Sequence, residues 1–288
     1  MRTQEVNATT PLKDYISFWM ASYKYRSVKS ATYDRLETSF DALKGYVIAE
    51  RPIGEIAADD IQEDVNQLTA YGYAATTIKK QMRIVTAPLR HAAAQHRISA
   101  DPMVGVVLPA ATHVKKQPRK AEAHDDAEQE RLRRILATHQ RSGYAAIELM
   151  IETGMRVGEV LAIEWRNVNL NRKTIRIEAT VVRLANKRMS QVQAGAKSES
   201  SNRTIPLSMR TVDILSELKV DSRMPWVFSG SDNDRLSYEA LRYQTQLATA
   251  DAGVPYKGKH VFRHTFATNC YYKGAISRAC QSFSDMPM

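Results

Sequence analysis

A basic segment, HVKKQPRK at residues 113–120, separates two parts of the chain that have different hydrophobic patterns. In the first part, apolar residues recur with the period of an amphipathic helix. Four such stretches occupy residues 11–25, 30–47, 58–72 and 75–98. The first part is therefore predicted to be an all-α bundle.

The second part mixes helical and strand patterns. Residues 172–180 (RKTIRIEAT) alternate polar and β-branched residues, which predicts a strand. Residues 181–207 continue as extended chain with a turn near 194–201. Helices are predicted at 124–140, 144–154, 158–168, 208–218 and 237–253, and again through the motif KHVFRHTFAT. We expect a mainly α fold with a small antiparallel β-sheet, in which a four-helix domain precedes a mixed α+β domain.

The charge balance points toward a polyanionic partner. The 288 residues carry a formal net charge of +10, and a basic surface attracts phosphates through counterion release. Residues 1–112 contain 13 Lys and Arg against 12 Asp and Glu, residues 113–120 contain 4 against 0, and the remainder contains 24 against 19. A basic linker that crosses a nucleic-acid backbone explains this distribution, although a solvated tether would also have it.

The sequence contains no apolar run of signal-peptide length and no window long enough to span a membrane. Its two cysteines, Cys270 and Cys280, are too few for a disulfide framework and match no zinc spacing. We expect a soluble, cytoplasmic protein with no membrane partner.

The stretch TGMRVGEVLAIEW, residues 153–165, places Arg156 at the start of a helix and Glu159 three residues later. A guanidinium held there by a carboxylate suits the two non-bridging oxygens of a phosphate. In isolation, the same pattern is typical of an ordinary surface ion pair.

The stretch KHVFRHTFAT, residues 259–268, places His260 and Arg263 three residues apart, so a helix would present them on one face with His264 off that face. Two arginines and a histidine at one point would neutralise a developing pentacoordinate phosphate. Lys197 lies in the loop of the predicted hairpin, where an amine can act as a general acid or simply remain a solvated turn residue.

At these residues the chain resembles the tyrosine recombinase family, the integrases of phages and conjugative transposons. TGMRVGE resembles the family's first arginine box, KHVFRHTFAT resembles its second, and GAKSESSNRTIPL resembles the hairpin between them. The helical part that ends in ADPMVGVVLP is similar to the family's core-binding domain.

The resemblance implies a covalent mechanism that uses no cofactor and no metal. A tyrosine attacks the scissile phosphate, forms a 3′-phosphotyrosyl bond and frees a 5′-hydroxyl. Arg156 and Arg263 would hold the phosphate, Lys197 would protonate the leaving oxygen and His260 would assist proton transfer. Glu159 would support Arg156, and His264 is expected to have a structural role.

The resemblance also implies four segments and a partner. Residues 8–110 form the helical core-binding domain, 111–122 the basic linker, 123–275 an incomplete catalytic domain and 276–288 an out-of-frame tail. The expected partner is duplex DNA that carries an attachment site, on which the chain could form a homo-oligomer. The residues expected to bind DNA are Lys79, Lys80, Arg83, Lys115 and Lys116.

The C-terminal residues depart from the family pattern. An LGH-like third box is expected about 23 residues after the second arginine, and the nucleophilic tyrosine about nine residues later. The chain ends YKGAISRACQSFSDMPM instead. Tyr271 and Tyr272 follow Arg263 closely on one continuing helix, and they are expected to pack into the core.

Back-translation of residues 275–288, shifted by two nucleotides, permits IKSLSKLLGHAD, with its Gly-His pair where the third box is expected. A frameshift near codon 275 is therefore predicted, and the chain is expected to bind DNA without cleaving it. The alternatives are a DNA-binding regulator or dominant-negative fragment that makes no use of catalysis, an unrelated helical regulator and a type IB topoisomerase. The helical first part and the spelling of the boxes favour the recombinase.

Overall fold

The computed structural model describes residues 6–110, 123–138, 141–183, 190–194, 202–220, 222–230, 234–258 and 260–272. The chain divides into two compact units, and among the described residues unit 1 contains 6–110 and unit 2 contains those from 123 to 272. Each unit is built around its own hydrophobic core. The basic linker with Lys115 and Lys116, the loop with Lys197 and the tail 276–288 lie outside the described residues.

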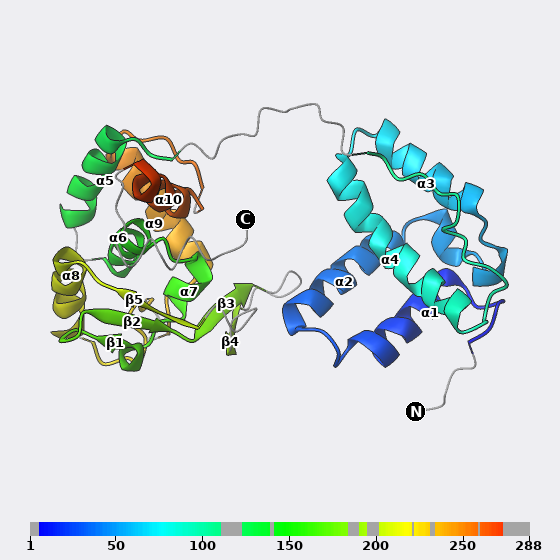
Figure 1. Ribbon diagram of the computed structural model, residues 1–288, viewed down its shortest axis with the longest axis horizontal. Coiled ribbons are helices and arrows are strands. Elements are labelled where there is room, and N and C mark those ends of the chain that lie inside the picture. Colours follow the sequence, from blue (N-terminus) through cyan, green and yellow to red (C-terminus); the bar gives the residue numbers. More distant parts are fainter. Residues whose placement is uncertain are drawn as a thin grey trace. The chain divides into compact units, whose positions relative to one another are not determined.

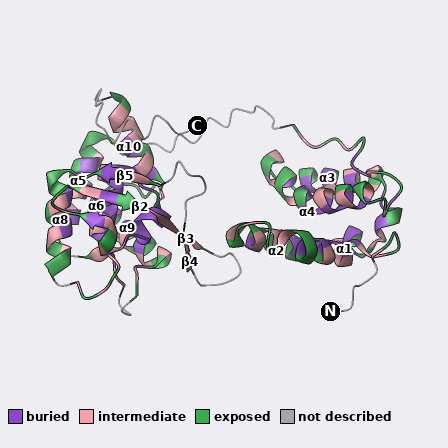
Figure 2. Ribbon diagram, turned by 60° about the horizontal axis from the view of Figure 1, so that its bottom comes forward, coloured by how far each residue is buried: buried purple, intermediate pink, exposed green. Residues whose placement is uncertain are grey.

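Unit 1 is helical, as the periodicity predicted. In the described residues it contains four α-helices, with a π-helix, Met20–Lys24, between the first two and two 3-10 turns, Val47–Glu50 and Ile53–Glu55, between the second and third. The α-helices are α1 (Leu12–Trp19), α2 (Ser30–Leu43), α3 (Ala58–Ala70) and α4 (Ala75–Ala94). Figure 2 shows their buried residues on the faces that they turn toward one another.

The apolar stripes read from the sequence form the core of unit 1. Helix α4 packs against α1, α2 and α3 and continues through Pro88. The Tyr15 hydroxyl hydrogen-bonds to the His91 ring at 3.0 Å and links α1 to α4, so this buried phenol has a polar partner. The fully buried side chains include Leu12, Tyr15, Ile16, Ile61, Ile78 and Leu89.

Unit 2 is organised around α6 (Ser142–Thr153), a helix that is apolar on nearly every side. Such a helix must be covered all round. It packs against α5 (Asp126–Thr138), α7 (Val157–Leu161), α8 (Met209–Val220), α9 (Tyr238–Asp251) and α10 (Val261–Tyr272). Figure 1 shows α6 among these helices, with the strands on one side of them.

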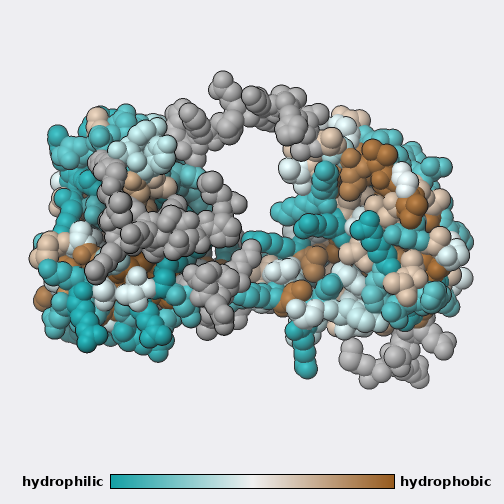
Figure 3. Space-filling model, viewed as in Figure 1, coloured by the Kyte–Doolittle hydropathy of each residue, from teal (hydrophilic) through white to brown (hydrophobic). Residues whose placement is uncertain are grey.

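Two small antiparallel sheets complete the described part of unit 2. One has the order β1-β2-β5, formed by Val168–Asn169, Thr174–Ile177 and Arg203–Pro206. The other is the pair β3 (Ala179–Arg183) and β4 (Ser190–Ala194). The fold class predicted from the sequence, mainly α with small antiparallel β structure, is confirmed. Figure 3 shows hydrophilic residues over much of the visible face of this unit.

Two local predictions were wrong. The helix predicted over 158–168 ends at Leu161, because the next segment pairs with the chain near Trp226: Val227 N donates to Ile163 O at 3.0 Å. Tyr271 and Tyr272, expected in the core, are 81% and 79% exposed. They lie in the last turn of α10, off the stripe of buried residues that ends at Phe266.

Candidate functional site

Arg156 is positioned by the tight turn that ends α6. Gly154 ends the helix in the left-handed conformation, with φ +63°, which favours glycine. A Cβ at this position would also lie 2.3 Å from the Phe266 ring of α10. The chain can therefore turn tightly through Met155, and Arg156 becomes the N-cap of α7.

Glu159 is the centre of the polar contacts. Its carboxylate accepts from the Arg156 backbone N–H at 2.9 Å and from Arg156 Nη1 at 2.9 Å. It also accepts from Arg203 Nη1 at 3.2 Å and Arg203 Nη2 at 2.9 Å. Burial alone would raise the pKa of Glu159, but the hydrogen bonds from Arg203 and Arg156 outweigh burial and lower it. Glu159 is therefore a buried carboxylate, and the pair is not the ordinary surface ion pair that the motif alone allowed.

Arg263 reaches the same place from α10. Its Nη1 donates to the carbonyl oxygen of Gly154 at 2.8 Å. Burial, together with the positive charges of Arg156 and Arg203, lowers the pKa of Arg263 to about 10 against the opposing effect of Glu159. The guanidinium groups of Arg156, Arg203 and Arg263 thus lie within electrostatic reach of one carboxylate, so the cluster has an excess of positive charge.

The two histidines lie at the start of α10. His260 immediately precedes the helix, its side chain is exposed, and its carbonyl oxygen accepts from His264 N at 3.1 Å. The His264 side chain is also exposed. The structure therefore brings together Arg156, Glu159 and Arg263, whereas Lys197 lies outside the described residues.

Arg203 was missed by the sequence analysis. It lies on β5, opposite Ile177 of β2, and it is two residues from Ile205, which is 2% exposed. Side chains two apart on a strand share a face, so Arg203 points toward the interior. The signal was present in NRTIPL, because an arginine on the buried face of a strand requires a carboxylate partner.

Strand β3 packs closely against α7. A Cβ on Gly158 would lie 2.4 Å from the Val181 carbonyl oxygen and 2.7 Å from the Tyr238 hydroxyl, so only glycine permits this approach. The Tyr238 hydroxyl donates to Val181 O at 2.9 Å. Burial, and then the charge of Glu159, raise the pKa of Tyr238 to about 12, so the phenol remains a donor at neutral pH.

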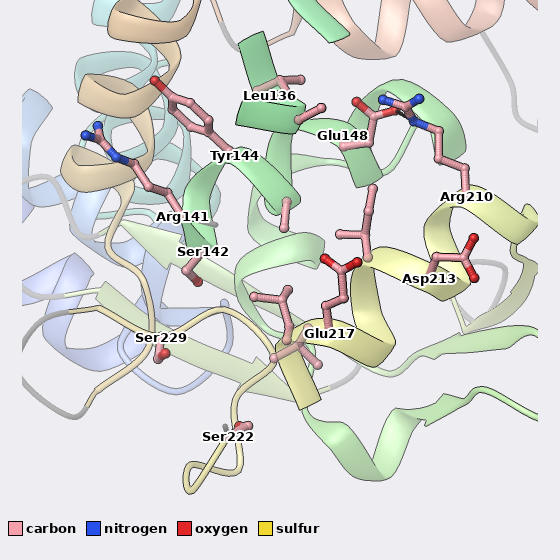
Figure 4. A pocket seen from close by; sticks show the side chains of 15 residues that line it. Leu136, Arg141, Ser142, Tyr144, Glu148, Arg210, Asp213, Glu217, Ser222 and Ser229 are labelled. Carbon is pink, nitrogen blue, oxygen red and sulfur yellow. Dashed lines mark hydrogen bonds and ion pairs between the residues drawn. The ribbon is translucent and has the colours of Figure 1, made fainter. Parts of the chain in front are cut away.

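A cavity of about 680 Å³ lies elsewhere in unit 2, between α5, α6, α8 and the loop around Ser229 (Figure 4). Buried Glu148 lies on its wall, and Arg210 Nε donates to that carboxylate at 2.7 Å. Arg156, Glu159, Arg203 and Arg263 do not line it. The cavity is therefore separate from the arginine cluster.

In unit 1, the side chains of Lys79, Lys80 and Arg83 are exposed on α4, which leaves their charges accessible to a polyanion. In the described ranges, no helix combines the length and the apolar character that crossing a membrane requires.

The family model for the phage integrase family matches residues 125–285. The chain belongs to the phage integrase family of tyrosine recombinases. The matched region contains Arg156, Glu159, Arg203 and Arg263.

Individual proteins are similar to this integrase-family chain over most of its length. A XerC-like tyrosine recombinase of Caldanaerobacter subterraneus subsp. tengcongensis is 24% identical, and the alignment covers 91% of this chain and 73% of that protein. The integrase of Staphylococcus phage L54a is 24% identical over 74% of this chain and 63% of its own length.

Solved integrases show the same fold. The Tn1549 transposon integrase in complex with transposon right end DNA superimposes with a TM-score of 0.77 at 17% identity and covers 97% of this chain and 92% of that one. A lambda integrase tetramer bound to a Holliday junction gives a TM-score of 0.68 at 16% identity and covers 98% and 76%.

Proposed function

We propose that this chain is a site-specific DNA recombinase by descent and that its arginine cluster binds the scissile phosphate of duplex DNA. The observation that carries the proposal is that two arginines from distant parts of the sequence lie near one buried carboxylate: Arg156 donates to Glu159 at 2.9 Å, and Arg263, which donates to Gly154 O at 2.8 Å, lies within its electrostatic reach. An excess of forked guanidinium groups around a fixed anchor suits the singly charged phosphodiester and the more negative transition state of phosphoryl transfer.

Within this proposal each predicted residue has a role. Arg156 and Arg263 hold the phosphate, Lys197 protonates the leaving oxygen and His260 assists proton transfer. Residues 8–110 and 123–275 act as the core-binding and catalytic domains, joined by the linker 111–122. Exposed Lys79, Lys80 and Arg83, together with Lys115 and Lys116, bind backbone phosphates near an attachment site, where several copies of the chain assemble.

We further propose that the polypeptide of these 288 residues binds DNA without cleaving it. Tyr271 and Tyr272 lie about 12 to 14 Å beyond Arg263 along α10, at 1.5 Å per residue. Their position on the same continuing helix does not turn them back toward a phosphate held by Arg263. Phosphoryl transfer needs a nucleophile in line with the leaving oxygen, whereas binding depends mainly on phosphate contacts.

Binding is tested by fluorescence anisotropy with a duplex of random sequence over a range of salt concentrations. We expect the dissociation constant to rise steeply with salt, and substitution Arg156→Ala or Arg263→Ala to reduce the slope of log K against log salt by about 1. Arg176→Ala is the control, because Arg176 is 67% exposed and pairs with Glu178 on the surface. Equal slopes for all variants would refute phosphate binding by the cluster.

Cleavage is tested by incubation with a library of nicked duplexes and separation on a denaturing gel. We expect no covalent protein–DNA adduct. An adduct that disappears in Tyr271→Phe or Tyr272→Phe would identify one of these exposed tyrosines as the nucleophile and overturn the proposal that the chain cannot cleave.

A further inference from the structure

Two arginines share the Glu159 carboxylate, but they hold it differently. Arg203 donates to both carboxylate oxygens through both terminal nitrogens, and its side chain is 11% exposed. Arg156 contributes one terminal nitrogen at 2.9 Å, and its side chain is 47% exposed. The buried arginine therefore fixes the carboxylate, and the exposed arginine is the one presented to solvent.

The backbone supports of the two arginines also differ. Arg203 extends from β5, which is paired along its length with β2. Arg156 and Glu159 belong to the start of α7, a helix of five residues whose own hydrogen bonds provide little rigidity. The bidentate bond from Arg203 therefore ties this short helix to the sheet and limits the positions open to the Glu159 carboxylate.

We propose that Arg203 is a positioning residue of the phosphate site: by holding Glu159 against the sheet, it orients the Arg156 guanidinium toward DNA. This inference rests on the proposed function. A direct role for Arg203 as a phosphate ligand is disfavoured, because both of its terminal nitrogens already donate to Glu159 and the side chain is nearly buried.

A double-mutant cycle separates these roles. The dissociation constant for a random-sequence duplex is measured at 0.1 M salt for the parent, Arg156→Ala, Arg203→Met and the double variant. We expect each single substitution to weaken binding roughly eightfold. One phosphate contact contributes about 0.9 to the slope of log K against log salt, and at 0.1 M salt this corresponds to a factor of about eight in affinity. The double variant should bind within about twofold of Arg156→Ala, because both changes remove the same contact.

Two outcomes would overturn the proposal. Additive effects, giving roughly sixty-fold weaker binding in the double variant, would show that Arg203 contacts DNA independently. Unchanged affinity in folded Arg203→Met would show a role in stability alone. Arg210→Met is the matched control, because Arg210 also pairs with a buried carboxylate, Glu148, at 2.7 Å but lies at the separate cavity.

An NMR measurement on the free protein gives a readout that does not require DNA. The Arg156 Nε–H signal, assigned by its loss in Arg156→Ala, should shift or broaden in Arg203→Met and Arg203→Lys and remain unchanged in Arg210→Met. An unchanged signal would refute positioning. If Arg203→Met does not fold, Arg203→Lys, which keeps the charge and loses the fork, takes its place in both measurements. If the parent does not bind DNA, the proposed function fails while the NMR result still tests positioning.

Discussion

Replacing Glu159 by glutamine should destabilise unit 2 by about 3 kcal/mol. Removing one member of a buried ion pair costs roughly 3–5 kcal/mol, because the remaining charge is left uncompensated. Arg203, at 11% exposed, is close to a fully buried partner, so losing its pairing with Glu159 should cost nearly this much. Solvent reduces the contribution of half-exposed Arg156 to at most about 1 kcal/mol. The glutamine oxygen can still accept one hydrogen bond, which places the expected cost at the lower end of the range.

Urea unfolding followed by tryptophan fluorescence measures this cost. The chain has three tryptophans; Trp165 and Trp226 belong to unit 2, so a Trp19→Phe background makes the signal specific to that unit. Glu178→Gln is the control, because it removes one member of an ion pair that is 67% and 38% exposed and should cost less than about 0.5 kcal/mol. A cost below about 1 kcal/mol for Glu159→Gln would refute the buried role of Glu159.

The pH dependence of the stability of the same variant independently tests the direction of the Glu159 pKa shift. The pKa of Glu159 is lower in the folded protein than its ordinary value of 4.5. Its stabilisation is therefore fully present above pH 4.5 and is lost as the pH falls through the folded pKa. The difference in unfolding free energy between the parent and Glu159→Gln should accordingly narrow below pH 4.5.

Two further predictions follow from buried positions in unit 2. Gly154→Ala should lower the free energy of unfolding, measured in urea, by at least about 2 kcal/mol, because it adds backbone strain at φ +63° and a clash with Phe266. Gly253→Ala is the control, because Gly253 has a similar φ of +61° but lies in open space, and it should cost only about 1 kcal/mol. Equal costs for the two variants would refute the clash. Burial lowers the pKa of His124 despite its contact with Glu128, so the parent should lose stability as the pH falls below 6.5, and His124→Leu should lessen this loss in thermal unfolding scans at pH 5 to 7; identical pH profiles would contradict it.

The helices of unit 1 could be predicted because each depends on a pattern local to its own residues. The stripe Ile78, Met82, Val85 and Leu89 has the helical period, and all four residues are buried on α4. The prediction of a helix over 158–168 was wrong because this segment depends on residues far away in the sequence. Ile163 and Trp165 take backbone partners at Val227 and Pro225, and a pairing between segments so distant in sequence leaves no local signal.

Part of the arrangement of the candidate site could be predicted from the sequence. Arg156, Glu159 and Arg263 were found from their motifs, and the structure brings them together. Arg203 was overlooked because the strand pattern was interpreted only for its apolar residues, although its alternation with Ile205 already placed the arginine inward. The partner of a buried charge is a tertiary fact, since Glu159 lies on a helix and Arg203 on a strand of the sheet.

The backbone N-terminus of α7 is not the part of the candidate site that attracts an anion. An exposed helix N-terminus can bind a phosphate through its backbone N–H groups. Here the Arg156 N–H donates to Glu159 of the same helix, and the helix has only five residues. A carboxylate therefore already occupies this N-terminus, so it would repel a phosphate instead of binding it. At this site, attraction for a phosphate must therefore come from the guanidinium groups, which outnumber this one carboxylate, so we expect the orientation of Arg156 to decide whether the site binds DNA.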